Sequence, residues 1–243
     1  ENIIFSEKVT LKDNENLISI ESNKIKYEKK KDLVYSHGDT TIIIKNNYKI
    51  NSKNLYFDRN QQIIYGNKKA VIYDSKENVF ELSDKFKINL VDEIIESKNA
   101  LIKDKYENQY SFENLMVDLK NNEIVGKELN INFKKSYFGN EKNDPILKGR
   151  SSFSNDDELR VFKGVFSTCN IENKKCRGWE LNTEEFKHDK KDKIFEYKNS
   201  WLKIFDYKIF YLPYFNHPDP SVKRKSGLLT PSYTSSDSLG TSI

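Results

Sequence analysis

The stretch from Leu55 to Gly66 reads LYFDRNQQIIYG and decides the fold. Leu55 and Phe57 alternate with other side chains, four polar residues follow from Asp58 to Gln61, and a second apolar run begins at Ile63. Short alternating runs bounded by Asp, Asn and Gly are typical of β-strands joined by a tight turn. We therefore predict an antiparallel hairpin here.

The same pattern recurs at a period of about thirty residues between residues 17 and 133. Sixty residues after the first hairpin, Leu115, Asp118 and Gly126 hold the places of Leu55, Asp58 and Gly66. Self-similarity at a fixed period indicates a repeat architecture. Further pairs, separated by 30 or 31 residues, are Ser22 with Ser52, Ile25 with Leu55, Tyr27 with Phe57, Leu33 with Ile63, Leu55 with Phe86, and Ala70 with Ala100.

Two short strands per repeat limit how the sheet can roll up. A propeller blade usually needs four strands and about 40 or more residues per repeat. Paired short strands favour a stacked, elongated β-taco or jelly roll. The predicted fold is therefore all-β, with repeated antiparallel strands.

The rest of the chain is less periodic. We expect residues 134–163 to be less regular, and a short strand from Leu159 to Phe166. Aromatic-rich runs should then continue the sheet at 194–197, 201–205 and 207–215. Because proline cannot donate to a β ladder, Pro218 and Pro220 should end it.

Composition narrows the class of protein. Hydrophobic residues make up 36% of the 243 residues and charged residues 32%. No stretch approaches the roughly 20 apolar residues of a spanning helix, which excludes a helical membrane protein. The net charge is +4, and basic and acidic residues are interspersed along the chain, so we expect solvated sheet faces and no nucleic-acid partner. The chain begins at Glu1 without a signal peptide, so we expect a processed chain or a fragment, which does not imply a cytoplasmic protein.

Signatures of catalysis and of metal binding are absent from the sequence. No Gly-x-Ser-x-Gly, His-Glu-x-x-His or phosphate loop occurs, and two cysteines without a matching pair make a poor zinc site. We predict no enzyme activity, no catalytic residue, no metal and no cofactor. The three histidines are scattered, and we expect His37, His188 and His217 at the surface.

Pairs of apolar residues at i and i+2 should point to the inside of the roll. Such a set can form an ordinary packed core, or it can line an apolar trough that takes acyl chains. The residues alone leave both interpretations open. The candidate lipid-binding residues are Ile25, Tyr27, Leu55, Phe57, Phe86, Ile88, Leu115, Val117, Ile131 and Phe133.

An aromatic strand and a basic cluster stand near the end of the chain. Residues 210–215 read FYLPYF, and Lys223, Arg224 and Lys225 follow after the prolines. These three cations suit a membrane–water boundary, because they cannot lie in hydrocarbon.

These motifs closely resemble the LptD (OstA) family of outer-membrane lipopolysaccharide-assembly proteins. The resemblance rests on residues 210–215, on RKSGLLTPS at residues 224–232, and on FSTC at residues 166–169, with Trp179 beyond it. It implies a jelly-roll form of the fold. It also implies a periplasmic OstA-like domain at residues 1–222, and the first strand of a truncated outer-membrane β-barrel at residues 223–243.

The resemblance implies lipopolysaccharide transport and insertion into the outer membrane, with this part of the chain facing the periplasm. Lipid A chains would pass along the trough to the basic cluster. An LptA-like bridge protein would pair with the strand near Ile3 to Leu11, and an LptE-like lipoprotein would occupy the missing barrel. Two alternatives stay open: a soluble LptA-like bridge protein, and a surface β-solenoid adhesin that binds no lipid.

Cys169 and Cys176 lie seven residues apart with polar residues between them. A local disulfide is geometrically possible and would stabilise the fold by roughly 2–3 kcal/mol. Free thiols are an alternative. The family resemblance adds a third: a bond from Cys169 to a cysteine of the barrel.

Overall fold

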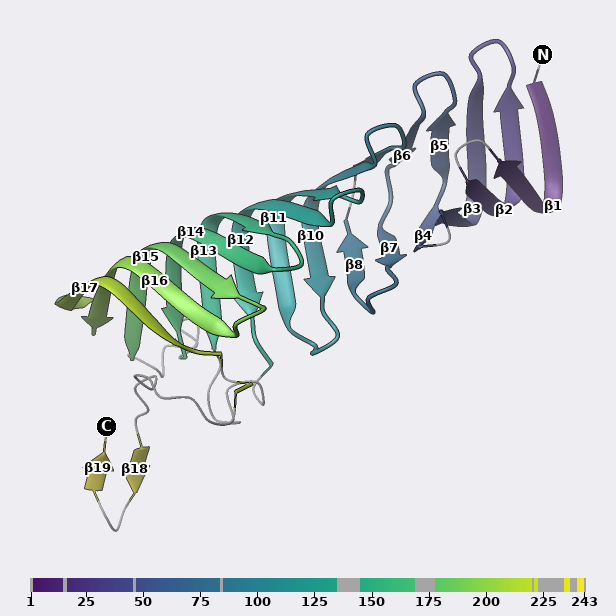
Figure 1. The fold of residues 1–243 in the computed structure, drawn as a ribbon. Coiled ribbons are helices and arrows are strands. Elements are labelled where there is room, and N and C mark those ends of the chain that lie inside the picture. Colours follow the sequence, from purple (N-terminus) through teal and green to yellow (C-terminus); the bar gives the residue numbers. More distant parts are fainter. Residues whose placement is uncertain are drawn as a thin grey trace.

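The protein is an elongated, antiparallel all-β structure, as predicted (Figure 1). The computed structural model describes residues 2–14, 17–45, 47–83, 85–134, 145–168, 178–219, 221–222, 234–236 and 240–242. No helix occurs in these ranges. The strands are β1 (Asn2–Asp13), β2 (Ile18–Glu28), β3 (Leu33–Ile44), β4 (Tyr48–Lys53), β5 (Leu55–Asp58), β6 (Ile63–Gly66), β7 (Ala70–Tyr73), β8 (Val79–Leu82), β9 (Phe86–Asn89), β10 (Ile94–Lys103), β11 (Gln109–Asp118), β12 (Glu123–Asn132), β13 (Ile146–Ser154), β14 (Glu158–Ser167), β15 (Trp179–Asp189), β16 (Ile194–Ile204), β17 (Tyr207–Pro218), β18 (Thr234–Ser236) and β19 (Gly240–Ser242).

The predicted hairpins form, and the two that lie sixty residues apart pair equivalent residues. Leu55 of β5 pairs with Gly66 of β6, and Leu115 of β11 pairs with Gly126 of β12. The strands stack along one long axis, with β1 at one end and β17 at the other (Figure 1). The strands β18 and β19 form a separate two-stranded sheet.

The sheet divides in two between β3 and β10. The amino-terminal part of β3 pairs with β5 and its carboxy-terminal part with β4. One branch continues through β7 and β8, the other through β6 and β9, and both rejoin on β10. Gly38 lies at the first fork with a φ of 83° and Asn99 at the second with a φ of 50°. Left-handed backbone breaks the ladder there, so that one strand serves two branches.

Later strands are long and bend in the middle. Glu128, Lys163 and Asn199 have positive φ angles of 51°, 54° and 50°, and each lies at an interruption of its ladder. Pro213 lies opposite Asn199 at the interruption between β16 and β17, which explains how a proline fits inside a strand. Each bend folds its strand over the interior.

Buried hydroxyls satisfy backbone groups where the ladders break. The Ser36 hydroxyl accepts from the Leu55 amide at 2.8 Å, and the Ser52 hydroxyl donates to the Lys69 carbonyl at 3.0 Å. An unpaired buried backbone group costs roughly 1–3 kcal/mol. These two buried serines therefore stabilise the divided part of the sheet.

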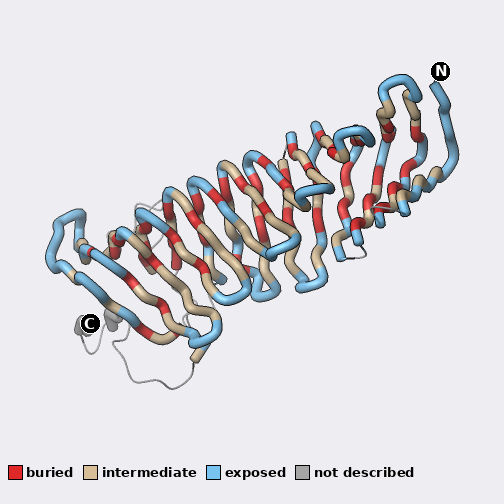
Figure 2. Tube along the Cα trace, turned by 45° about the horizontal axis from the view of Figure 1, so that its top comes forward, coloured by how far each residue is buried: buried red, intermediate tan, exposed pale blue. Residues whose placement is uncertain are grey.

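The interior is a continuous apolar core along the molecule. Buried positions follow one another from strand to strand, while the turns are exposed (Figure 2). Two repeat-related glycines admit aromatic rings: a Cβ on Gly66 would lie 2.1 Å from the Phe86 ring, and one on Gly126 would lie 2.2 Å from the Phe112 ring. At each of these two positions an aromatic ring fills the space that a Cβ would need, which explains why the residue is glycine.

Two parts of the sequence prediction were wrong in detail. Residues 146–154, expected to be irregular, form the regular strand β13. The runs at 194–197 and 201–205 are largely one strand, β16, because the bend at Asn199 does not end it. The sheet does end at Pro218, as expected.

Candidate functional site

A cleft of about 760 Å³ opens between two rows of turns. The first rim comprises the turns at residues 74–78 and 104–108, and the second comprises the turns at 119–122, 155–157 and 190–193 together with Asp219. Ligand sites typically occupy roughly 300–1,000 Å³. The lining residues are Tyr48, Asp74, Lys76, Asn78, Phe80, Ile102, Asp104, Lys105, Tyr106, Asn108, Tyr110, Phe112, Val117, Asp118, Asn122, Ile124, Ser152, Ser154, Asn155, Asp156, Leu159, His188, Lys190, Lys193, Asp219 and Ser221.

Both rims are held by their own hydrogen bonds. The turns DSKEN at 74–78 and DKYEN at 104–108 repeat at thirty residues, and in each the Asp carboxylate accepts from the Asn amide and from two backbone N–H groups. On the second rim, the Lys190 N–H donates to the Asp157 carbonyl and the Asp219 N–H to the Lys193 carbonyl, both at 2.8 Å. These bonds join successive turns into a fixed edge.

The floor of the cleft is apolar. Its side chains come from strand positions near the turns. Phe112 lies at the bottom, in the space that Gly126 leaves open. The other apolar floor residues are Phe80, Ile102, Val117, Ile124 and Leu159. An apolar floor between charged rims suits a ligand with one apolar and one polar part.

Two exposed ion pairs join residues of different turns, and the first of them crosses the cleft. Lys76 of the first rim lies 2.5 Å from Asp156 of the second, and Lys45 lies 2.6 Å from Glu93. All four side chains are partly or largely exposed, so each pair contributes roughly 0–1 kcal/mol. Such weak pairs can open and close readily.

The carboxy-terminal end of the interior is filled with aromatic rings. Tyr197 packs against Phe186, Phe215 and His217 with ring centroids 5.2–5.5 Å apart. Its hydroxyl lies 3.0 Å from Nε2 of His217, while Nδ1 of His217 lies 2.8 Å from the Pro218 carbonyl oxygen. Nδ1 therefore carries the proton and Nε2 accepts from the tyrosine.

The prediction of surface histidines was wrong for His217, which is only 4% exposed. Burial lowers its pKa, since the charged imidazolium is poorly solvated there. His188 is also partly withdrawn from water, and its Nε2 lies 2.7 Å from the buried Asp219 carboxylate. Only His37 is exposed as expected. Scattered spacing hid these contacts, because antiparallel strands join residues that are distant in sequence.

The structure places the ten candidate lipid-binding residues inside the roll, but mostly within the packed core. Eight are buried, and Tyr27 and Phe133 pack partly exposed against the same core. Only Val117 also lines the cleft. The sequence analysis missed the other floor residues. These residues share a feature that could have been used to predict them: each points inward and lies near a rim turn, as Ile124 does after the turn at 119–122.

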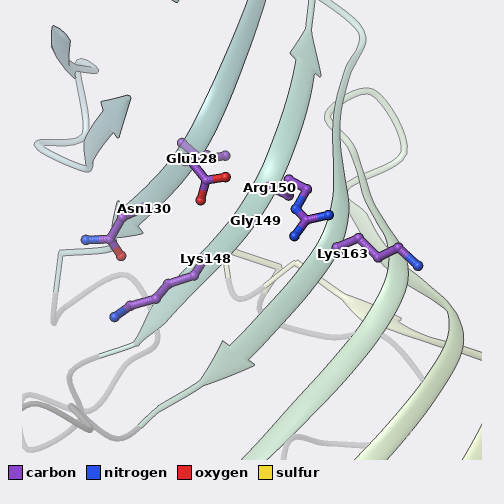
Figure 3. A pocket seen from close by; sticks show the side chains of 7 residues that line it. Glu128, Asn130, Lys148, Gly149, Arg150 and Lys163 are labelled. Atoms are coloured by element: carbon purple, nitrogen blue, oxygen red, sulfur yellow. The ribbon is translucent and has the colours of Figure 1, made fainter. Parts of the chain in front are cut away.

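A second hollow, of about 500 Å³, lies outside the bends of β12, β13 and β14. Lys148 and Lys163 point away from one another in Figure 3, with Arg150 between them. Lys163 already pairs with Glu184. Because its cations diverge and Lys163 is already paired, this hollow is a poorer binding site than the cleft.

The amino-terminal strand β1 has a free edge in the described structure, where its ladder runs to β2. Ile3, Ile4 and Phe5 are 43%, 58% and 48% exposed. Three predicted features, Lys223 to Lys225, Cys169 and Cys176, lie outside the described residues. None of the described residues belongs to a helix long and apolar enough to cross a membrane.

Comparison with known proteins gives a partial match. No family model matches the chain. Over 62 residues, 26% of the chain, it is 42% identical to the LPS-assembly protein LptD of Pseudoalteromonas translucida (strain TAC 125), and the match spans 8% of that protein. This stretch supports an LptD-like relation.

Proposed function

We propose that this chain carries the lipid part of lipopolysaccharide during assembly of the outer membrane. The observation that carries the proposal is the cleft, whose apolar floor lies between two charged rims. Acyl chains would lie on the floor while the sugars stay in water. The role is binding and transport, and no bond is made or broken.

The energetics suit a moving cargo. Each buried CH₂ group stabilises binding by about 0.8 kcal/mol, and this contribution has no preferred direction. A lipid with several chains can therefore be held without being fixed at one position. The partial match to an LPS-assembly protein and the motifs near the carboxy-terminus support this cargo.

The proposal extends to location and partners. We place the chain at the outer membrane, with residues 1–222 on the periplasmic side and residues 223–243 at the start of a membrane barrel that an LptE-like lipoprotein occupies. The free edge of β1 would add a strand from an LptA-like bridge protein through main-chain hydrogen bonds. Lys223 to Lys225 would meet lipid phosphates at the membrane boundary.

Binding of lipid A tests the proposal. Purified chain is titrated with lipid A and, as a matched control, with the same disaccharide after removal of its acyl chains. We expect binding of lipid A alone. Equal binding of both compounds, or binding of neither, would contradict an acyl-carrying cleft.

A further inference from the structure

Lys190 is a cation withdrawn into the wall of the cleft without a carboxylate of its own. Its Nζ donates to the Ser154 hydroxyl at 3.0 Å and to the Asn155 carbonyl, which are both neutral acceptors. No ion pair to Lys190 occurs in the described part of the chain. Burial lowers the pKa of this lysine, because its charge is incompletely solvated. A partly buried cation with only neutral partners favours an incoming anion.

A second cation stands close to Lys190. The Lys76 ammonium bonds Asp156, and both charges of that pair act on Lys190. The pair is exposed and therefore weak. A bound anion can replace Asp156 as the partner of Lys76, so that two ammonium groups would hold it.

The rims are not basic in sum, since five aspartates and four lysines line the cleft. Most of these carboxylates are already engaged, however. Asp74, Asp104 and Asp118 accept hydrogen bonds from their own turns. Asp219 lies 2.7 Å from Nε2 of His188. Hydrogen bonding leaves their negative charge in place, and Asp104, Asp156 and Asp157 all act on Lys190, so direct contacts with the two ammonium groups must hold the anion.

We propose that Lys190 and Lys76 form a phosphate subsite at the mouth of the cleft, which binds the phosphorylated headgroup of an amphiphile whose acyl chains lie on the floor. This inference rests on the proposed function and names the group recognised at that site. Binding of the headgroup would separate Lys76 from Asp156 and so widen the mouth where the chains enter. One contact would then couple recognition of the headgroup to opening.

The test compares dodecyl phosphate, dodecyl maltoside and inorganic phosphate by calorimetric titration of the full chain. We expect the wild type to bind dodecyl phosphate at least about tenfold more tightly than dodecyl maltoside, since a hydrogen bond to a charged group contributes about 1.5–3 kcal/mol. Lys190→Met should weaken the binding of dodecyl phosphate at least about tenfold more than the binding of dodecyl maltoside, so that the preference is lost. Lys190→Arg should retain it, which separates loss of charge from loss of fold.

Two further variants sharpen the result. Lys191→Met removes a lysine from the same turn that does not line the cleft, and it should leave the preference intact. Asp156→Asn frees Lys76 and should strengthen dodecyl phosphate binding several-fold.

The outcomes separate this inference from the proposed function. Equal binding of the two dodecyl compounds, or an equal effect of Lys190→Met on both, would overturn the subsite and leave the acyl cleft standing. Binding of neither compound would overturn both. Inorganic phosphate that binds as tightly as dodecyl phosphate would overturn the headgroup assignment.

Discussion

Replacing Ile124 by glutamate should weaken acyl binding while the fold survives. Ile124 is half-buried on the cleft floor, in β12, so a charge there keeps access to water in the empty protein. A bound chain would lose contact with about two CH₂ groups, or about 1.6 kcal/mol. Desolvating the carboxylate against the chain adds about 1 kcal/mol. The sum of about 2.6 kcal/mol corresponds to roughly 70-fold weaker binding.

Val125 provides the matched control. It is the next residue of the same strand, it is 38% exposed, and it does not line the cleft. Val125→Glu should leave the affinity for lipid A within about twofold of the wild type, because successive side chains of a strand point to opposite faces. The assay is titration of each variant with fluorescent lipid A, after thermal denaturation has confirmed folding. Equal affinity of the two folded variants would refute the assignment of the floor.

Three further experiments test the packing and the buried histidine. Ile88→Asp should cost more than about 4 kcal/mol and prevent folding, measured by circular dichroism, because Ile88 is fully buried in the core. Gly126→Ala should lower the free energy of unfolding by about 1–3 kcal/mol and also weaken lipid binding, because its Cβ displaces Phe112 into the cleft. Gly66→Ala should destabilise the protein as much in melting experiments but leave lipid binding unchanged. Burial lowers the pKa of His217, so below pH about 6.5 the unfolded chain gains a proton that the folded chain does not. As the pH falls, the free energy of unfolding measured in urea should therefore decrease by up to about 1.4 kcal/mol per pH unit. The slope should be less steep in His217→Gln, and identical slopes would contradict this.

The hairpins could be predicted from sequence because their signal is local. Leu55, Asp58 and Gly66 specify strand, turn and strand within twelve residues, and the spacing of thirty repeats them. The division of the sheet was not predictable in this way. It depends on the left-handed backbone of Asn99 and on which strand pairs with each half of β10. Neither feature can be recognised from the residue types in the sequence.

The site was only partly predictable for a related reason. Alternation correctly indicates that Phe57 and Ile124 differ from their outward neighbours, but it does not give their depth. Phe57 is 2% exposed and packs in the core, whereas Ile124 lies on the cleft floor. Depth depends on where each strand position lies relative to the rim turns, which is a property of the assembled roll. The same applies to Lys190, whose neutral partners come from another turn.

Photo-crosslinking of lipid at defined positions tests the central claim most directly. A photoreactive phenylalanine analogue is placed at Tyr110, which lines the cleft, or at Phe162, which is 39% exposed and lies away from it. Each protein is incubated with lipopolysaccharide and irradiated. We expect a lipopolysaccharide adduct from position 110 and none above background from position 162. Equal adducts at both positions, or an adduct at position 162 alone, would contradict transport through the cleft.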